Sequence, residues 1–390
     1  MPLSQTACHA NPAGPPDLRR RFGAAQGRNA HEPTQRAIQS PVDHSRYDRQ
    51  VLLPQIGPEG QRILASASVL LVGCGALGCV IADLLVRAGV GRLTLVDRDL
   101  VEATNLQRQS LYTEADADGL TPKATAAADR LHAVNSSVRI DPVIADLTGP
   151  TARGLLAKAE PDAILDGTDN FQTRFVLNDL AVEAGIPLVY GGVVGMEGTM
   201  LAVVPPRDGK PAGPCLTCLL GGIPEDPGGT CDTVGVFGPA VYQVAAWQAA
   251  QAIRLLLGEL PEPGVVQLNA WTGSQRTTTL GRDPACVTCV QRRFDHLDHP
   301  QAASADLCGQ NAVQVVPASP LSLDLPRIAE RLAPAGPVAT RAGLVRLSLA
   351  GAGDDGGDAM ITLFRDGRAI VKGVRTGSRG RALYDRYIGG

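Results

Sequence analysis

Residues 68–78 read Ser-Val-Leu-Leu-Val-Gly-Cys-Gly-Ala-Leu-Gly, and this stretch decides the fold. Its first half, Ser68–Val72, has the length and composition of a buried strand, and helical spacing of apolar residues begins at Leu77. The glycines between and beside them, Gly73, Gly75 and Gly78, have the spacing G-x-G-x-x-G. Such glycines permit a tight turn and let the backbone approach a phosphate, which the helix N-terminus attracts. The stretch therefore predicts the first strand and helix of a nucleotide-binding domain.

A carboxylate stands at the end of the next expected strand. Arg92–Val96 is a second apolar run, and Asp97 follows it, 19 residues after Gly78. A carboxylate at this place in a Rossmann-like unit accepts hydrogen bonds from ribose hydroxyls. The glycines and Asp97 together predict an adenine nucleotide site, but they do not distinguish NAD from ATP.

Strand and helix signals keep alternating as far as residue 290. Further strands are predicted at Val138–Ala145, Ala163–Leu165, Leu188–Tyr190, Met200–Val204, Val265–Leu268 and Gln275–Leu280, and helices at Lys123–His132, Gln172–Ala184 and Pro239–Leu257. This alternation is typical of a mainly parallel sheet with helices on both faces. We therefore expect an α/β fold with a Rossmann-like, mainly parallel sheet and an antiparallel continuation.

Composition divides the chain into four parts. Residues 1–44 hold six Pro and few large apolar residues, as expected of a disordered tail, and residues 45–290 form the nucleotide-binding domain. Residues 291–304 are interpreted as a solvated linker. Residues 305–390 predict a small α+β module with helices at Leu325–Leu332 and Ser378–Tyr387 and strands at Leu344–Leu349, Met360–Phe364 and Ala369–Lys372. The role of this module does not follow from the sequence.

The overall composition argues against several classes of function. The 390 residues carry a net charge of −3, so no global basic field recruits nucleic acid. The most apolar segment, residues 234–257, is interrupted by three Gln and an Arg, so no membrane span is expected. The odd number of Cys, nine, and the absence of an apolar leader predict a reducing, cytoplasmic location. Only His132 of the six His lies in the main domain, which argues against acid–base catalysis by His.

Polar residues around the glycine stretch favour ATP over a nicotinamide. They are Arg49 upstream and Asn105, Arg108, Gln109, Lys123, Asp169 and Asn170 downstream. Phosphoryl chemistry depends on cations that neutralise phosphate oxygens and on a carboxylate that holds Mg²⁺, whereas hydride transfer needs neither. A dehydrogenase is therefore only the third alternative.

Two cysteine pairs predict a structural metal site. Cys215-x-x-Cys218 and Cys286-x-x-Cys289 are separated by 67 residues, and four thiolates fit a tetrahedral Zn²⁺ that leaves no position open for catalysis. Cys231 stands alone in a Gly-rich loop before the long helix. A thiol near a helix N-terminus can have a lowered pKa and become a nucleophile, although Asp232 opposes this. The other interpretation of Cys231 is a small loop residue.

Over about residues 45–290 the sequence resembles the ThiF/MoeB/HesA family, bacterial relatives of the ubiquitin-activating enzymes. The resemblance rests on Arg49-Gln50, the three glycines, Asp97-x-Asp99, Asn105-Leu-Gln-Arg108-Gln109, Lys123 and Asp169-Asn170, taken in this order. It implies adenylation, with ATP and Mg²⁺, of the C-terminal glycine of a small ubiquitin-like sulfur-carrier protein. The family also has the paired cysteine arrangement.

The resemblance implies a role for each matching residue. Asp97 would bind the ribose, and Asp169 would face Mg²⁺ and the reacting centre. Arg49 would reach into the other subunit's site of a homodimer, and Cys231 would bond to the carrier. The phosphates would be bound by Asn105, Arg108 and Lys123.

Two further questions stay open at the level of sequence. Cys231 and the absence of a rhodanese domain favour a thiamine-type (ThiS-like) carrier over a molybdopterin-type (MoaD-like) carrier. An external sulfur donor is the other partner that we consider. A nucleotide-sensing or scaffold protein on the same fold is the alternative from another class. Against it stands the intact set Arg49, Arg108, Lys123 and Asp169.

Overall fold

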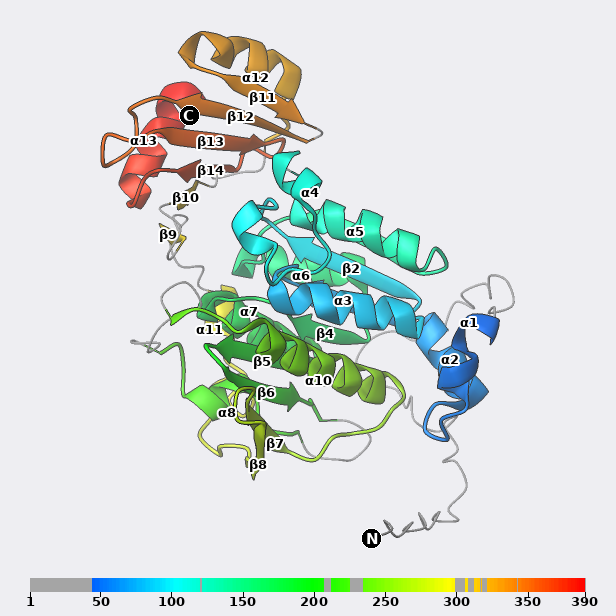
Figure 1. Cartoon of the computed structure of the whole chain (residues 1–390). Coiled ribbons are helices and arrows are strands. Elements are labelled where there is room, and N and C mark those ends of the chain that lie inside the picture. Colours follow the sequence, from blue (N-terminus) through cyan, green and yellow to red (C-terminus); the bar gives the residue numbers. More distant parts are fainter. Residues whose placement is uncertain are drawn as a thin grey trace.

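The first domain is built on one sheet of eight strands, in the order β3-β2-β1-β4-β5-β6-β7-β8 (Figure 1). The strands are β1 (Ser68–Val72), β2 (Arg92–Asp97), β3 (Arg139–Ile144), β4 (Ala163–Asp166), β5 (Leu188–Val194), β6 (Glu197–Val203), β7 (Gly264–Asn269) and β8 (Ser274–Thr279). Strands β1 to β5 pair in parallel, and β6, β7 and β8 continue the sheet antiparallel. This confirms the expected Rossmann-like sheet with its antiparallel continuation.

The computed structural model describes residues 44–119, 121–206, 212–224, 234–298, 306–307, 312–315, 317, 321–341 and 343–389. The expected disordered tail therefore lies outside the described residues, apart from His44, and so does Cys231. Within the described ranges, no helix is long and apolar enough to cross a membrane.

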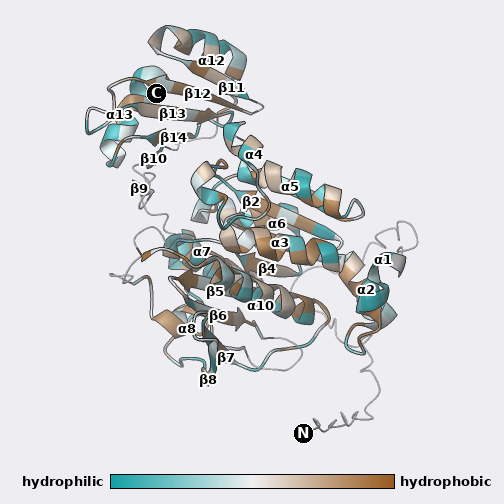
Figure 2. Ribbon diagram, viewed as in Figure 1, coloured by the Kyte–Doolittle hydropathy of each residue, from teal (hydrophilic) through white to brown (hydrophobic). Residues whose placement is uncertain are grey.

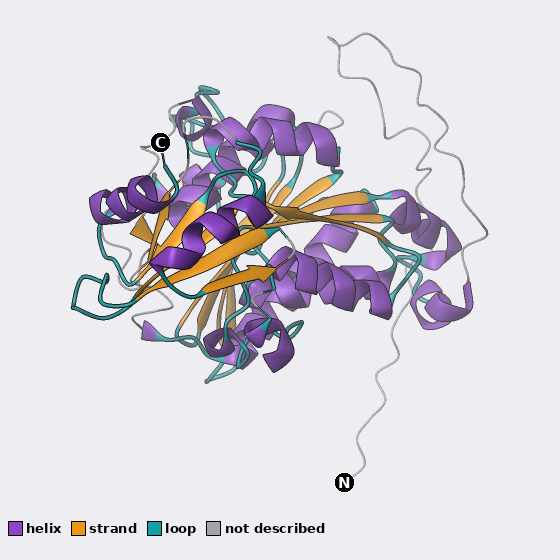
Figure 3. Ribbon diagram, turned by 90° about the horizontal axis from the view of Figure 1, so that it is seen from above, coloured by secondary structure: helices purple, strands orange, loops and turns teal. Residues whose placement is uncertain are grey.

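Helices cover both faces of the sheet, as Figure 3 shows. The helices of this domain are α1 (His44–Val51), α2 (Gly57–Ser66), α3 (Ala76–Ala88), α4 (Glu114–Asp118), α5 (Lys123–Val134), α6 (Gly149–Ala159), α7 (Phe171–Ala184), α8 (Leu216–Leu220), α10 (Gly238–Leu256) and α11 (Asp295–Asp298), with a 3₁₀ turn η2 (Ala103–Asn105). One core packs α3, α5 and α10 against the sheet, and a second packs α6 and α7 against the other face. All five residues of β1 are buried, because helices cover both faces of the sheet. Figure 2 shows the inner strands as mostly hydrophobic.

One expectation for the segment after residue 290 is wrong. Asp295–Asp298 is not a solvated connector but the short helix α11, which packs on α6 and α7. Leu297 is buried, and the ring of His296 lies 5.1 Å from that of Phe175. One large apolar residue in a polar segment is enough to anchor it, because a buried Leu contributes about 2 kcal/mol.

The C-terminal module is a separate antiparallel sheet of six strands, in the order β11-β12-β13-β14-β10-β9. Its elements are β9 (Asp306–Leu307), β10 (Ala312–Val315), α12 (Leu325–Leu332), a 3₁₀ turn η3 (Ala333–Ala335), β11 (Val338–Arg341), β12 (Leu344–Leu349), β13 (Ala359–Phe364), β14 (Ala369–Lys372) and α13 (Gly377–Tyr387). Helices α12 and α13 pack on one face of this sheet. Residues of the other face form an apolar cluster with Leu100, which lies in the loop after β2.

Candidate functional site

The loops that follow β1 and β4 touch through their backbones. Gly73 has φ +89°, in the left-handed region that favours glycine, and a Cβ there would lie 2.6 Å from the backbone of Gly167. A Cβ on Gly78 would overlap the carbonyl oxygen of Gly73. No side chain of the described residues caps the first turn of α3, and Gly75 lines the adjoining cavity. The amides of that turn are thus available to an anion.

This cavity lies at the carboxyl ends of the parallel strands, where ligands of open α/β sheets bind. Its wall includes most of the residues that the sequence proposed for a nucleotide: Gly73, Gly75, Asp97, Asp99, Asn105, Arg108, Gln109, Lys123, Asp169 and Asn170. The structure therefore brings together residues from three loops and from the start of α5. Gly78 packs against the carbonyl of Gly73 and does not line the cavity. Arg49 is not part of the cavity wall either.

Asp97 holds the glycine loop and the loop after β2 together. Its carboxylate accepts hydrogen bonds from the backbone N–H of Cys74, at 2.6 Å, and of Asp99, at 2.7 Å. Burial raises the pKa of Asp97 from 3.8 to about 6, and Lys123 limits the rise. The carboxylate thus stands between the turn and the cavity, where a ribose hydroxyl can donate to it.

Lys123 is a buried cation of the site. Its ammonium lies 3.1 Å from a carboxylate oxygen of Asp99, and its side chain is 8% exposed. Burial alone would lower the pKa of Lys123, but Asp99 and Asp97 outweigh burial and hold it above the usual value. For Asp99 the signs are reversed. Burial alone would raise the pKa of Asp99, but Lys123 and Arg98 together hold that pKa below the usual value. Lys123 is therefore charged at neutral pH and fixed in place.

Three other polar side chains of the cavity differ in the hydrogen bonds that they already make within the protein. The buried Gln109 has a side-chain oxygen without a hydrogen-bond partner in the described part of the chain, so it can serve a ligand. Arg108 donates to the carbonyl of Thr104 at 3.1 Å. Asn170 accepts from the N–H of Thr173 at 2.8 Å, which makes it the N-cap of α7 as well as part of the wall.

Sequence reasoning missed several residues of this wall, among them Arg98, Asp146, Gly167 and Arg174. Arg98 donates to Asp146 at 2.8 Å, and Arg174 donates to the carbonyl of Thr168 at 2.9 Å. Asp146 and Gly167 follow the ends of parallel strands, as Asp97 does, and this shared position was the signal that could have found them. Arg98 pairs with a residue of a different loop, so no local sequence pattern reveals it.

Arg49 lies far from this cavity within its own chain. It is exposed on α1, and α1 is held near the end of α3 by a hydrogen bond from Gln50 to the carbonyl of Ala88, at 3.0 Å. The cavity adjoins the start of α3, and 13 residues of helix span about 20 Å. Arg49 therefore cannot serve the cavity of the same chain.

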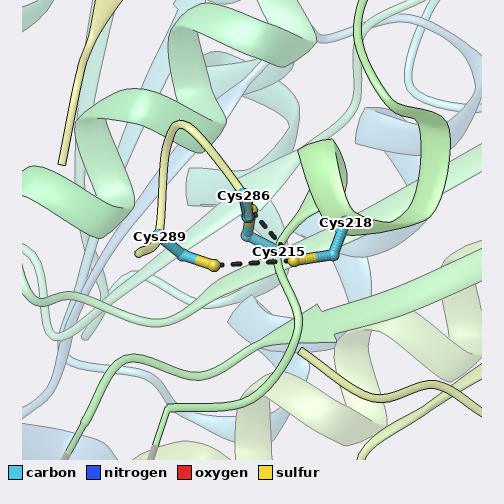
Figure 4. Close-up of side chains that lie close together, drawn as sticks. All are labelled: Cys215, Cys218, Cys286 and Cys289. Carbon is cyan, nitrogen blue, oxygen red and sulfur yellow. Dashed lines mark hydrogen bonds between the residues drawn. The ribbon is translucent and has the colours of Figure 1, made fainter. Parts of the chain in front are cut away.

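Four cysteines form the second candidate site. Cys215 and Cys218 from the start of α8 meet Cys286 and Cys289 from the loop after β8, and their sulfur atoms all lie within 4.8 Å of one another (Figure 4). Individual S–S separations are 3.6 Å for Cys215 and Cys286 and 3.5 Å for Cys218 and Cys289. Four sulfurs at about 2.3 Å from one tetrahedral Zn²⁺ would be about 3.8 Å apart, so the cluster fits the ion.

Hydrogen-bond donors next to the cluster favour ionised cysteine sulfurs. The backbone N–H of Asp283 donates to the sulfur of Cys218, and the guanidinium of Arg282 to the sulfur of Cys289, both at 3.5 Å. Burial raises the pKa of Cys289 to about 11, so this thiol needs a nearby cation to be ionised at neutral pH. The cluster could therefore hold a metal ion.

Comparison with known proteins follows from this geometry. The fold and the cavity define a Rossmann-like protein with a charged pocket at the carboxyl ends of its parallel strands. The model of the ThiF family matches residues 47–288, which is more than half of the chain. The chain belongs to the ThiF family.

Curated relatives include two adenylyltransferases. The sulfur carrier protein ThiS adenylyltransferase of Bacillus subtilis (strain 168) is 41% identical over 349 residues, which cover 88% of this chain and 99% of that protein. The molybdopterin-synthase adenylyltransferase of Escherichia coli (strain K12) is 39% identical over 248 residues, covering 63% of this chain and 96% of that protein. An alignment that covers 88% of this chain cannot fit before residue 305, so the likeness to the Bacillus protein extends into the C-terminal module.

The fold has counterparts among solved structures. A crystal structure of E. coli MccB with ATP superimposes with a TM-score of 0.54 and 23% identity, covering 63% of this chain and 75% of that one. At this identity the likeness concerns the fold alone.

Proposed function

We propose that the chain adenylates the C-terminal glycine of a ubiquitin-like sulfur-carrier protein with ATP, on the thiamine (ThiS-like) side. The observation that carries the proposal is the fixed, buried Lys123 beside Asp97 and Asp99 at the cavity, with Asn105 and Arg108 on the same wall. The names of the two relatives support the reaction, and the greater coverage of the Bacillus protein supports the thiamine side.

The proposed reaction needs positive charge beside the phosphates and a fixed position for the reacting groups. The carrier carboxylate is ionised at neutral pH, so no general base is needed, and none of the described residues that line the cavity is a His. A bond forms between a carboxylate oxygen and the α-phosphorus, and the bond from that phosphorus to pyrophosphate breaks. One anion attacks another, and Lys123 and Arg108 lower the barrier by neutralising phosphate oxygens in a fixed geometry.

Two metal ions complete the proposal. Asp169 is exposed on the wall of the cavity and offers hard oxygen ligands, so it would hold Mg²⁺, which supplies further positive charge to the phosphates. Zn²⁺ would be held by Cys215, Cys218, Cys286 and Cys289 as a structural ion. A reducing cytoplasm would keep these thiols available.

Carrier-dependent exchange of labelled pyrophosphate into ATP tests the function. We expect exchange with a ThiS-like carrier that ends in glycine, and none with the same carrier lacking that residue. Preference for a MoaD-like carrier would support the molybdopterin alternative. Binding of ATP without exchange for any carrier would favour a nucleotide-sensing or scaffold protein instead.

Cys231, which lies outside the described residues, is proposed as a thiol that bonds to the activated carrier and passes on sulfur from an external donor. Cys231→Ser should keep pyrophosphate exchange and lower the yield of carrier thiocarboxylate. Normal thiocarboxylate formation in that variant, with no covalent adduct in the wild type, would make Cys231 a loop residue only.

A further inference from the structure

The C-terminal module docks beside the phosphate end of the proposed nucleotide site. The face of its sheet opposite α12 and α13 presents Ala312, Leu344, Phe364 and Ile370, which form one apolar cluster with Leu100 of the loop after β2. This cluster places the module against the loop that also carries Asp97 and Asp99.

Polar contacts surround the apolar cluster. Arg98 donates to the side-chain oxygen of Gln314 at 2.8 Å, and Arg368 donates to the carbonyl of Ile144 at 2.8 Å. Lys372 forms an ion pair with Glu102. Because Gln314 and Arg368 are buried, these contacts fix the module on the first domain instead of tethering it loosely.

A second, smaller cavity lies between the module and the first domain. The first domain lines it with Asp99, Leu100, Glu102, Asn105 and Lys123, and the module lines it with Arg346, Thr362, Ile370 and Lys372. Three of these residues, Asp99, Asn105 and Lys123, also line the nucleotide cavity. The two cavities therefore adjoin at the residues proposed to bind phosphates.

Among the described residues, one cation of this second cavity forms no ion pair. Lys123 is paired with Asp99, and Lys372 with Glu102. Arg346, on β12, makes one long contact, 3.4 Å from its Nε to the hydroxyl of Thr362, and no carboxylate in the described residues comes within 4.0 Å of its guanidinium. Arg346 is half-buried, so water competes only partly for its remaining donors.

We propose that Arg346 of the C-terminal module binds the terminal phosphates of ATP, and the pyrophosphate formed from them, across the second cavity from Lys123. This inference rests on the proposed function, since it places the phosphates at Asn105 and Lys123. A guanidinium presents a planar fork of donors that matches phosphate oxygens, which suits it to bridge the gap between the two domains. The module is thereby part of the nucleotide site.

The test compares ligands that contain and lack the terminal phosphates. Isothermal calorimetry on the full chain with Mg²⁺ would measure inorganic pyrophosphate, ATP and AMP for the wild type, Arg346→Met and Arg346→Lys. Loss of one charge-assisted contact should weaken pyrophosphate and ATP binding about 10- to 100-fold. AMP binding should stay within about twofold, and Arg346→Lys should recover part of the loss. Arg341→Met, which changes an exposed Arg on the neighbouring strand β11, is the matched control and should match the wild type.

Two results would overturn the inference. Unchanged pyrophosphate binding in Arg346→Met would make Arg346 an interface residue only. Equal losses for AMP and pyrophosphate in a folded Arg346→Met chain would mean that the module supports the whole site without touching phosphate. Failure of the proposed function is a separate outcome, because it shows as absent pyrophosphate exchange in a wild type that still binds ATP.

Discussion

Lys123 combines burial, charge and a fixed partner in Asp99, and it is the residue on which the proposed chemistry depends most. Lys123→Ala should lower carrier-dependent pyrophosphate exchange about 10²- to 10³-fold, the usual loss for one preorganised charge at a reacting centre. Lys158→Ala, at an exposed Lys on α6, is the control and should exchange like the wild type. Exchange at the wild-type rate in the Lys123 variant would remove Lys123 from the mechanism.

Asp97 gives the site a dependence on pH. Its pKa is raised to about 6 by burial, so the carboxylate is mostly ionised above pH 6 and protonated below it. If only the ionised form binds the ribose, affinity for adenosine should fall about tenfold from pH 7 to pH 5. Adenosine is the suitable probe because it carries no phosphate that titrates in this range. Asp97→Asn should bind more weakly at pH 7 and show a flat profile; a slope that persists in this variant belongs to another group.

Residues of the site differ in how far the sequence reveals them. Gly73, Asp97 and Lys123 belong to local patterns, in which spacing along the chain reflects one turn or one strand end. The contact of Arg98 with Gln314 joins residues 216 positions apart, and no local pattern encodes such a pairing. The same holds for Arg346, which reaches the site only because two sheets dock.

Helix α7 joins the two candidate sites at the scale of elements. Its N-cap, Asn170, lies at the nucleotide cavity, and Asn178 accepts from the N–H of Leu216 in the cysteine knuckle at 2.8 Å. Asp179, the next residue, accepts hydrogen bonds from Thr288 and from the N–H of His296. A disturbed cysteine cluster should therefore also disturb the helix that caps the nucleotide cavity.

Removal of two thiols tests the metal at this scale. Cys286→Ser/Cys289→Ser should lower zinc content, measured by plasma mass spectrometry, from about one ion per chain to near zero. It should also lower the free energy of unfolding by an amount on the order of several kcal/mol, because metal-binding energy is folding energy. Cys79→Ala, at a buried thiol outside the cluster, should keep its zinc. Purified wild type without zinc, or zinc retained in the double variant, would contradict the assignment.

Elements with strong periodicity could be predicted from the sequence, and weakly patterned ones could not. Ser68–Val72 and Leu344–Leu349 were predicted residue for residue, because buried strands carry continuous or alternating apolar residues. Helix α6 was missed because its Gly and Ala residues carry little periodic apolar signal. Helix α11 was missed because its burial depends on partners in α6 and α7.

At the scale of the whole molecule, the distance of Arg49 from its own cavity favours a second copy of the chain. Leu52 and Leu53 follow Arg49 and are 70% and 50% exposed, which leaves apolar surface for a partner on that side. We therefore expect a homodimer in which Arg49 of each chain serves the cavity of the other.

Mixed variants test this arrangement. Arg49→Ala and Lys123→Ala chains should each be inactive in exchange, and a heterodimer of the two should contain one complete site. Random mixing should then restore about a quarter of the wild-type activity. Mixing either chain with an Arg49→Ala/Lys123→Ala chain should restore none. A fully active monomer, or no recovery on mixing confirmed heterodimers, would rule the arrangement out.

The contact between the glycine loops constrains how this site can change. A Cβ at Gly73 or at Gly167 would lie about 2.5 Å from backbone atoms of the opposite loop, so neither position accepts even alanine without moving a strand end. Selection from random variants for a new substrate should therefore leave these codons untouched. Useful substitutions would instead gather on walls made of side chains, such as Val193, Val236 and Val241, where a change in size reshapes the cavity and the loop contact survives.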